Sequence, residues 1–231
     1  MRRPELCVAL DLPTAADALR LADAVAEPAV WYKVGPVLFV SEGPPLVRAL
    51  VERGLRVFLD LKWHDIPNTV EGAVAAAAGL GASLATLHLA GGRAMLEMAV
   101  RAREGSALRL VGVGVLTSFS AAGYSTVVGR EVADVAAEQE RFARGAIGSG
   151  LDGFVCAVPE APMLRKLAGP EALLVTPGIR RAADAAGDQQ RTATPTEAAR
   201  AGADLLVVGR PITAAVDPAA AVRGFLAEMV Q

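Results

Sequence analysis

The chain has 231 residues, 53% of them apolar, so it is long and apolar enough to bury a large core. Its 23 basic and 25 acidic residues give a formal net charge of −2, which produces no overall field toward nucleic acid or an anionic membrane. These numbers exclude binding of polyanions through net charge, so any anion must be bound by a local site.

Eight short runs rich in leucine or β-branched residues recur along the chain. They are continuously apolar instead of alternating with polar residues, which predicts strands buried on both faces of a parallel sheet. In chain order the runs cover residues 6–11, 30–35, 56–62, 83–89, 108–117, 153–158, 172–179 and 204–210.

Alanine-rich segments with charged residues at helical spacing separate these runs, as in 15–25, 44–54, 130–150 and 194–203. Eight βα repeats in 231 residues average about 29 residues each, which predicts a (β/α)8 TIM barrel forming a single domain over residues 1–231. A doubly wound open sheet is the alternative fold. Helices that end in glycine just before the next run fit either fold, because the residue after a helix often takes positive φ; these glycines are Gly54, Gly81 and Gly202.

The stretch 72–92 carries no formally charged residue and is long enough to cross a bilayer. Alanine and glycine dominate it, however, and it changes to a strand-like pattern at 83–89, which favours a buried helix followed by a buried strand. The first apolar run is too short for a secretory signal, and Cys7 and Cys156 are isolated, so they make no disulfide framework. We therefore expect a cytoplasmic protein.

Polar or charged residues stand at the ends of most of the predicted strands. In a TIM barrel these ends meet on the face that carries the active site. Charges are costly to bury unless they are paired, so their repeated occurrence at strand ends indicates a site. In chain order the candidates are Asp11, Lys33, Asp60, Lys62, Thr117, Ser118, Arg180, Gly209 and Arg210.

The segment 58–70 is the most informative. Asp60 and Lys62 are two residues apart, so on a regular strand their side chains share a face, while Asp65 falls in the following loop. With Lys33 they form an alternating array in which an opposite-charge contact at ~4 Å is worth on the order of 4 kcal/mol at an effective dielectric of about 20. Such contacts favour the charged forms and make a held lysine a proton donor. We expect neither a cofactor nor a metal, since the sequence carries no electron-sink cofactor motif.

Seven motifs, spread in order over nearly the whole chain, resemble the orotidine 5′-phosphate decarboxylase family. The central one is D-x-K-x-x-D-I-P-x-T at 60–69, whose D-x-K-x-x-D core also occurs in sugar-phosphate decarboxylases of the same superfamily. The other six are A-L-D at 9–11, K-V-G at 33–35, V-L-T-S at 115–118, T-P-G-I-R at 176–180, G-D-Q at 187–189 and V-G-R-P-I-T at 208–213.

The resemblance implies cofactor-independent decarboxylation of orotidine 5′-phosphate to uridine 5′-phosphate in de novo pyrimidine biosynthesis. Lys62 would stabilise the carbanion-like transition state and protonate the pyrimidine carbon, with Asp60 near the departing carboxylate and Lys33 at the ribose. The resemblance also implies a homodimer in which Asp65 and Thr69 reach the partner's site.

Further assignments follow from the same resemblance. The polar segment 180–191 would be a lid over the phosphate. The remaining ligands implied are Asp11 for a ribose hydroxyl, Thr117 or its neighbours Ser118 and Ser120 for the base, Arg180 for the lid and nucleotide, and Gln189, the Gly209 backbone and Arg210 for the phosphate.

Two rival functions remain. A Mg2+-dependent sugar-phosphate decarboxylase would hold its metal with carboxylates, whereas Lys33 would repel a cation. A nucleotide-binding barrel without catalysis would not need the complete charged array. His64 and His88, the only two histidines, are too few for a zinc site of histidines and are expected to be structural.

Overall fold

The computed structural model describes residues 3–25, 30–182, 184 and 191–230. Within these residues eight parallel strands pair in chain order, and the last pairs with the first, which confirms the (β/α)8 barrel and rules out the open sheet. The strands are β1 (Glu5–Ala9), β2 (Val30–Val34), β3 (Arg56–Trp63), β4 (Leu84–His88), β5 (Arg109–Val113), β6 (Gly153–Val155), β7 (Leu173–Thr176) and β8 (Leu205–Val208).

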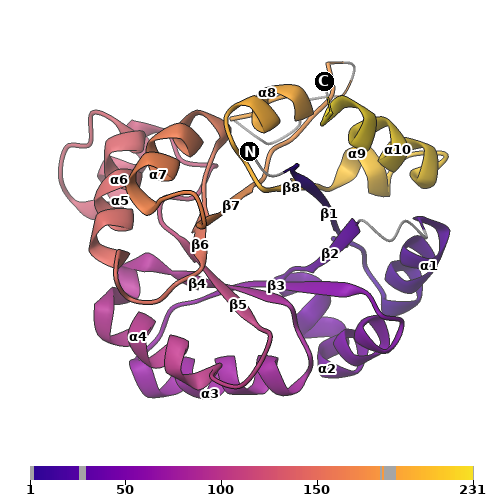
Figure 1. Ribbon diagram of the computed structural model, residues 1–231, viewed down its shortest axis with the longest axis horizontal. Coiled ribbons are helices and arrows are strands. Elements are labelled where there is room, and N and C mark those ends of the chain that lie inside the picture. Colours follow the sequence, from indigo (N-terminus) through magenta and orange to yellow (C-terminus); the bar gives the residue numbers. More distant parts are fainter. Residues whose placement is uncertain (1–2, 26–29, 183, 185–190, 231) are drawn as a thin grey trace.

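Helices form a ring outside the strands, as Figure 1 shows. They follow from the alanine-rich, amphipathic segments of the sequence, which bury one face against the barrel. Their bounds are α1 (Ala15–Val25), α2 (Pro36–Glu52), α3 (Pro67–Gly79), η1 (Leu89–Gly91), α4 (Gly92–Ala102), α5 (Ala121–Val128), α6 (Val135–Ala146), η2 (Val158–Glu160), α7 (Ala161–Ala168), α8 (Pro195–Arg200), α9 (Arg210–Thr213) and α10 (Pro218–Glu228).

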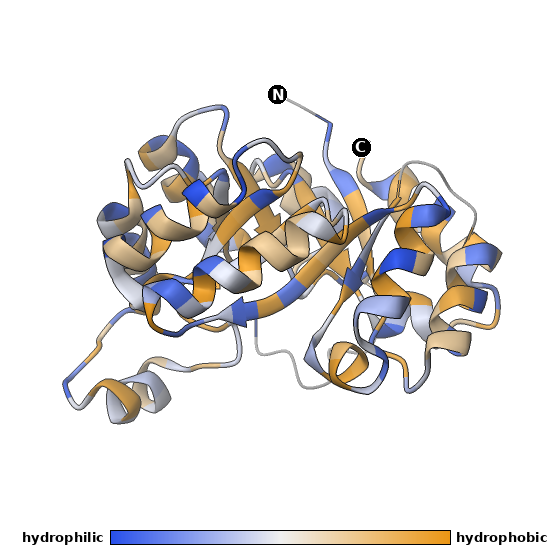
Figure 2. Ribbon diagram, turned by 90° about the horizontal axis from the view of Figure 1, so that it is seen from below, coloured by the Kyte–Doolittle hydropathy of each residue, from blue (hydrophilic) through white to orange (hydrophobic). Residues whose placement is uncertain are grey.

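Alternate residues of each strand supply two separate apolar layers. One layer fills the barrel and includes Trp31, Phe58 and Val207, and the other lies between strands and helices and includes Tyr32 and Leu59. Because both faces of a strand are buried, the runs read as continuously apolar, and the strands in Figure 2 are mostly orange.

Seven of the eight strands end earlier than the sequence predicts, most clearly after Val113 and Thr176, whereas β3 ends one residue later, at Trp63. Beyond these points residues such as Val115 and Ile179 stay buried although the sheet has ended, so apolar character alone cannot mark the boundary. Consequently several predicted strand-end residues lie on loops above the barrel. The predicted helix at 15–25 matches α1, and Gly54, Gly81 and Gly202 have the expected positive φ.

The uncharged stretch 72–92 forms the end of α3, then β4 and η1. The order of a helix followed by a buried strand is confirmed, but α3 buries only one face: Val74 and Ala77 are buried, whereas Ala75 and Ala76 are exposed. No helix among the residues that the structure describes is long and apolar enough to cross a membrane.

Candidate active site

A cavity of about 390 Å³ opens at the carboxyl ends of the strands. The residues of the barrel interior form its apolar floor, and loops after several strands supply its polar walls. The structure brings together here eight of the residues singled out from the sequence: Asp11, Lys33, Asp60, Lys62, Thr117, Arg180, Gly209 and Arg210.

Four of these side chains form a continuous chain of opposite charges. The Lys33 Nζ atom lies 3.1 Å from Asp11 Oδ1 and 3.7 Å from Asp60 Oδ2. On the far side of the same carboxylate, Lys62 Nζ lies 2.8 Å from Asp60 Oδ1. The order Asp11, Lys33, Asp60, Lys62 places one ammonium between two carboxylates and leaves the other at the end of the row, against the cavity.

The pKa values of the inner pair show that the charges support one another. Burial by itself raises the pKa of Asp60, but the ammonium groups of Lys62 and Lys33, with hydrogen bonds from Lys62 and Thr86, hold it below its ordinary value. Burial by itself lowers the pKa of Lys33, and the carboxylates of Asp60 and Asp11 outweigh this and raise it. Both groups are therefore ionised at neutral pH.

The backbone that carries Asp60 and Lys62 is not a regular strand. The pairing of β3 with β4 passes from Leu59 opposite Ala85 to Trp63 opposite Leu87, so three residues of β3 face one residue of β4. Lys62 has a φ of 49°, a left-handed conformation that costs a non-glycine residue on the order of 1 kcal/mol. The two side chains do converge, but the predicted regular-strand geometry is wrong.

Asp65 and Thr69 lie outside this row of charges. Both side chains are exposed, at the start of α3, and neither lines the cavity of the described chain. Asp65 instead accepts a hydrogen bond from the backbone of Ile66 at 2.7 Å. One chain therefore contributes Lys33, Asp60 and Lys62 to the array, and the role of Asp65 and Thr69 across a dimer stays a prediction.

The loops after β7 and β8 form the wall opposite β3. Arg180 is buried and donates to the carbonyl of Ile179 at 2.8 Å, while Gly209 and Arg210 lie where β8 passes into α9. The predicted ligand Gln189, and with it most of the predicted lid, lies outside the described residues.

The loop after β5 supplies the third wall. Thr117 lines the cavity, whereas Ser118 and Ser120 are exposed, and the Ser120 hydroxyl accepts from the backbone of Gly123 as the N-cap of α5. The Arg191 guanidinium donates to the Thr117 carbonyl at 3.4 Å, so the loop after β7 contacts the loop after β5. Of the three alternatives for a base contact, Thr117 alone faces the cavity among the described residues.

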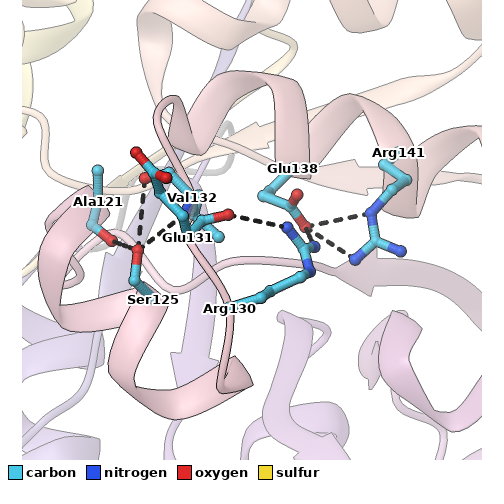
Figure 3. A network of polar contacts seen from close by, with 7 residues as sticks. All are labelled: Ala121, Ser125, Arg130, Glu131, Val132, Glu138 and Arg141. Carbon is cyan, nitrogen blue, oxygen red and sulfur yellow. Dashed lines mark hydrogen bonds and ion pairs between the residues drawn. The ribbon is translucent and has the colours of Figure 1, made fainter.

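Polar contacts hold α5 and the loop after it in place, as Figure 3 shows. The Ser125 hydroxyl donates to the Ala121 carbonyl at 2.8 Å and accepts from the Val132 amide at 2.9 Å. Farther along, the buried Glu138 carboxylate of α6 accepts from Arg130 at 2.7 Å and from Arg141 at 2.8 Å. Ser125 thus joins α5 to the loop that follows it, and Arg130 joins that loop to α6.

The two histidines stack with ring centroids 5.1 Å apart, and His88 Nδ1 accepts from the Ala90 amide at 3.2 Å. Among the described residues no group of three or more histidine, cysteine, aspartate or glutamate side chains could hold a metal ion. Hydrogen bonding and stacking account for both rings, in keeping with the structural role expected from the sequence.

Two features of the site escaped sequence reasoning. Thr86 of β4 hydrogen bonds to both Asp60 and Lys62, although in the sequence it is one hydroxyl within an apolar run. The floor of the cavity is formed by ordinary core residues, whose position under the charges depends on the closure of the barrel. They are Ala9, Phe58, Val113, Val155, Val175 and Val207.

In chemical terms the site presents a cationic donor at the edge of an apolar floor, beside a fixed carboxylate. The Lys62 ammonium can stabilise negative charge that forms on a bound carbon atom, and it can then transfer a proton to that atom. The cationic groups at the opposite wall can bind an anionic part of the same molecule.

Comparisons with known families, sequences and solved structures all identify relatives of one family. Residues 4–225 match the model of the family described as orotidine 5′-phosphate decarboxylase / HUMPS. The chain is 51% identical over 224 residues to the orotidine 5′-phosphate decarboxylase of Anaeromyxobacter sp. (strain K), covering 96% of both chains, and 46% identical over 235 residues to that of Nitratidesulfovibrio vulgaris (strain DP4), covering 97% of both. Among solved structures, the orotidine 5′-phosphate decarboxylase from Lactobacillus acidophilus superposes with a TM-score of 0.86 at 34% identity over the full length of both chains.

Proposed function

The chain belongs to the orotidine 5′-phosphate decarboxylase / HUMPS family, and we propose that it converts orotidine 5′-phosphate to uridine 5′-phosphate in de novo pyrimidine biosynthesis. The observation that carries this proposal is the Lys62 ammonium, held 2.8 Å from the buried Asp60 carboxylate at the edge of the cavity. This donor needs no cofactor to act on the substrate.

The proposed reaction starts with the substrate carboxylate near Asp60. The bond between the ring carbon and the carboxylate breaks, the electron pair remains on the ring carbon, and CO2 leaves. The Lys62 ammonium stabilises this pair and donates a proton to the carbon, after which the neutral amine regains a proton from water. Asp60 and Lys33 keep the ammonium in place because their charges alternate with it.

The rest of the nucleotide is assigned by chemistry and position. Asp11 and Lys33 form the wall suited to ribose hydroxyls, and Thr117 the wall suited to the base. We assign the phosphate to Gln189, the Gly209 backbone and Arg210, since phosphate sites of this fold follow the seventh and eighth strands, and we assign Arg180 to the lid and the nucleotide. Contacts to a phosphate remote from the reacting carbon can then contribute to transition-state stabilisation.

We also propose a homodimer with shared sites. Asp65 and Thr69 are exposed next to Ile66, an apolar side chain that is 66% exposed, so this loop is available to a second copy of the chain. In this arrangement each site takes Lys62 from one subunit and Asp65 from the other.

The rival function is a Mg2+-dependent sugar-phosphate decarboxylase. Two ammonium groups flank Asp60, at 2.8 and 3.7 Å, and both would repel a divalent cation from the carboxylate that it would need. The charge arrangement therefore favours the nucleotide substrate.

Incubation with orotidine 5′-phosphate, followed by the loss of its ultraviolet absorbance, tests the proposed activity. We expect turnover that is unchanged by a chelator. Turnover of a sugar phosphate that stops with the chelator would support the rival, and binding without any spectral change would support a nucleotide-binding barrel without catalysis.

Mixing two inactive variants tests the shared site. Lys62→Ala and Asp65→Ala chains are each expected to be inactive, whereas their hybrid dimer holds one intact site and recovers part of the activity. Subunit exchange is verified independently by mass spectrometry of the mixture. No recovery after verified exchange would exclude sharing of Asp65.

A cytoplasmic location is part of the proposal. Cys7 and Cys156 are both buried as free thiols, and burial raises the pKa of each, which keeps them protonated and unreactive. Nothing in these two side chains requires an oxidising compartment.

A further inference from the structure

We infer that Thr86 is a positioning residue for decarboxylation: its hydroxyl joins the Lys62 backbone to the Asp60 carboxylate and so fixes where the Lys62 ammonium points. The inference rests on the proposed function, in which Lys62 is the proton donor. Thr86 itself does not line the cavity, so it acts through the residues that do.

The first support is the register of the two strands. Leu59 pairs with Ala85 and Trp63 pairs with Leu87, which leaves Thr86 as the single residue of β4 opposite residues 60–62. A bulge of this kind interrupts the regular backbone ladder, so the amides within it need other partners. Thr86 is the β4 residue placed to supply one.

The second support is the hydrogen bonding of the hydroxyl group. The Lys62 amide donates to Thr86 Oγ1 at 2.8 Å, and Thr86 Oγ1 donates to Asp60 Oδ1 at 3.1 Å. A hydroxyl can accept and donate at once, and here one bond goes to the backbone of the lysine and the other to the carboxylate that pairs with its ammonium. The same Asp60 oxygen accepts from Lys62 Nζ at 2.8 Å, so the three residues form a closed ring of contacts.

The third support is the backbone conformation of Lys62. Its φ of 49° is uncommon for a lysine and persists only where surrounding contacts hold it. Thr86 is fully buried, and its bond to the Lys62 amide acts directly on this residue. Without the bond, the backbone can relax toward a regular strand and carry the ammonium away from its place beside Asp60.

The decisive experiment compares Thr86→Val, which keeps the shape of the side chain and removes the hydroxyl, with Thr86→Ser, which keeps the hydroxyl. We expect the valine variant to lose about 10- to 100-fold in kcat, the range for losing a hydrogen bond to a charged group, with KM changed by less than about threefold. The serine variant is expected to stay within about threefold of the parent in kcat. A loss in kcat without a change in KM would show that the substitution affects the position of the Lys62 ammonium and not the binding of the substrate.

Thr176→Val is the matched control for removing a buried strand hydroxyl. Thr176 is as deeply buried as Thr86, but among the described residues its hydroxyl has no hydrogen-bond partner. We expect this control to leave kcat within about twofold of the parent. Thermal melting of all variants shows whether each is folded at the assay temperature.

The parent enzyme is assayed first, because no turnover of orotidine 5′-phosphate by the parent refutes the proposed function and not the role of Thr86. With an active parent, a folded valine variant within threefold of parental kcat overturns the inference, as does a serine variant no better than the valine variant. If the valine variant does not fold, Thr86→Ala takes its place with the same expected kcat loss. If no variant without the hydroxyl folds, Thr86 is a stability residue and the inference is wrong.

Discussion

The two ends of the barrel both hold charged side chains, but they use them differently. At the carboxyl ends of the strands Lys33, Asp60 and Lys62 face a cavity. At the amino ends Glu5 and Arg56 enclose an aromatic ring, that of Trp31, which is 5% exposed. The first cluster keeps a cation available to a ligand, and the second has none of its residues in the cavity lining.

The contacts at the amino end account for this difference. Trp31 Nε1 donates to Glu5 Oε2 at 3.0 Å, and the other Glu5 oxygen accepts from Arg56. The Arg56 guanidinium lies 4.6 Å from the centroid of the Trp31 ring. The guanidinium of Arg109, the first residue of β5, lies 5.8 Å from the same centroid. These contacts join side chains of β1, β2 and β3 at the amino ends of the strands. We therefore expect substitutions in this cluster to affect stability, and substitutions in the cluster at the carboxyl ends to affect turnover.

The largest expected effect is that of Lys62→Ala. Loss of both the proton donor and the fixed cation lowers kcat by at least about 10⁴-fold, or roughly 5.4 kcal/mol of transition-state stabilisation. The variant should still fold and bind uridine 5′-phosphate, and the exposed Lys166 of α7 provides the control, Lys166→Ala, with parental activity. Single-turnover kinetics and calorimetric titration measure the two quantities. Activity of Lys62→Ala within tenfold of the parent would remove Lys62 from its role and end the contrast between the two clusters.

The second effect is that of Arg210→Ala, at the wall formed after β8. We expect kcat/KM for orotidine 5′-phosphate to fall at least ~100-fold, which is roughly 2.7 kcal/mol. For orotidine, which lacks the phosphate, the same substitution should change kcat/KM by less than about threefold, because this substrate has no phosphate for Arg210 to contact.

Steady-state kinetics with both substrates measures this difference. Arg101→Ala, on the exposed surface of α4, controls for the removal of a positive charge. Equal losses on the two substrates would show that Arg210 does not act through the phosphate.

The third effect belongs to the amino end of the barrel. Glu5→Ala removes the carboxylate that accepts from the Trp31 N–H and from the Arg56 guanidinium, which should lower the free energy of unfolding by about 1–2 kcal/mol. Because the site lies at the opposite end, kcat/KM should stay within about twofold of the parent. Urea unfolding and steady-state kinetics check both parts, and Glu97→Ala, which breaks an exposed pair with Arg93, serves as the control with a loss near 0.5 kcal/mol or less. A drop in the turnover of Glu5→Ala at unchanged stability would contradict the assignment of stability to the amino-end cluster and of turnover to the carboxyl-end cluster.

These two clusters also show what a sequence can and cannot reveal. The eight strands and the charged residues at their carboxyl ends are visible because burial on both faces and polar strand ends leave periodic traces. Asp60 and Lys62 were therefore found, although the bulge that carries them was not, because it depends on the pairing of β3 with β4. Thr86 was missed for the same reason, since its contacts with Asp60 and Lys62 come from its place opposite that bulge on the neighbouring strand β4.

The amino-end cluster left no comparable trace. Glu5, Trp31 and Arg56 are far apart in sequence, and each has an ordinary explanation on its own strand. Their meeting follows from barrel closure and from the register of β1, β2 and β3, in which Trp31 pairs with Arg56. Non-local pairing of this kind cannot be deduced from the local pattern of one strand.

The smallest expected effect concerns pH and returns to the carboxyl end. Burial first, and then the nearby His64 ring and Lys62 ammonium, hold the pKa of His88 below its ordinary value. The unfolded chain therefore binds a proton near pH 6.5 that the folded chain does not yet accept, so the free energy of unfolding falls as the pH drops below about 6.5. His88→Asn keeps an acceptor for the Ala90 amide and removes this titration. The free energy of unfolding of the variant should therefore depend less on pH between 7.5 and 5.5 than that of the parent. The difference between the two slopes should be smaller than the one-proton limit of about 1.4 kcal/mol per pH unit. Urea unfolding at several pH values measures both slopes, and Glu5→Ala, whose change lies at the other end, should keep the parental slope. Identical slopes for the parent and His88→Asn would place the pH dependence elsewhere in the molecule.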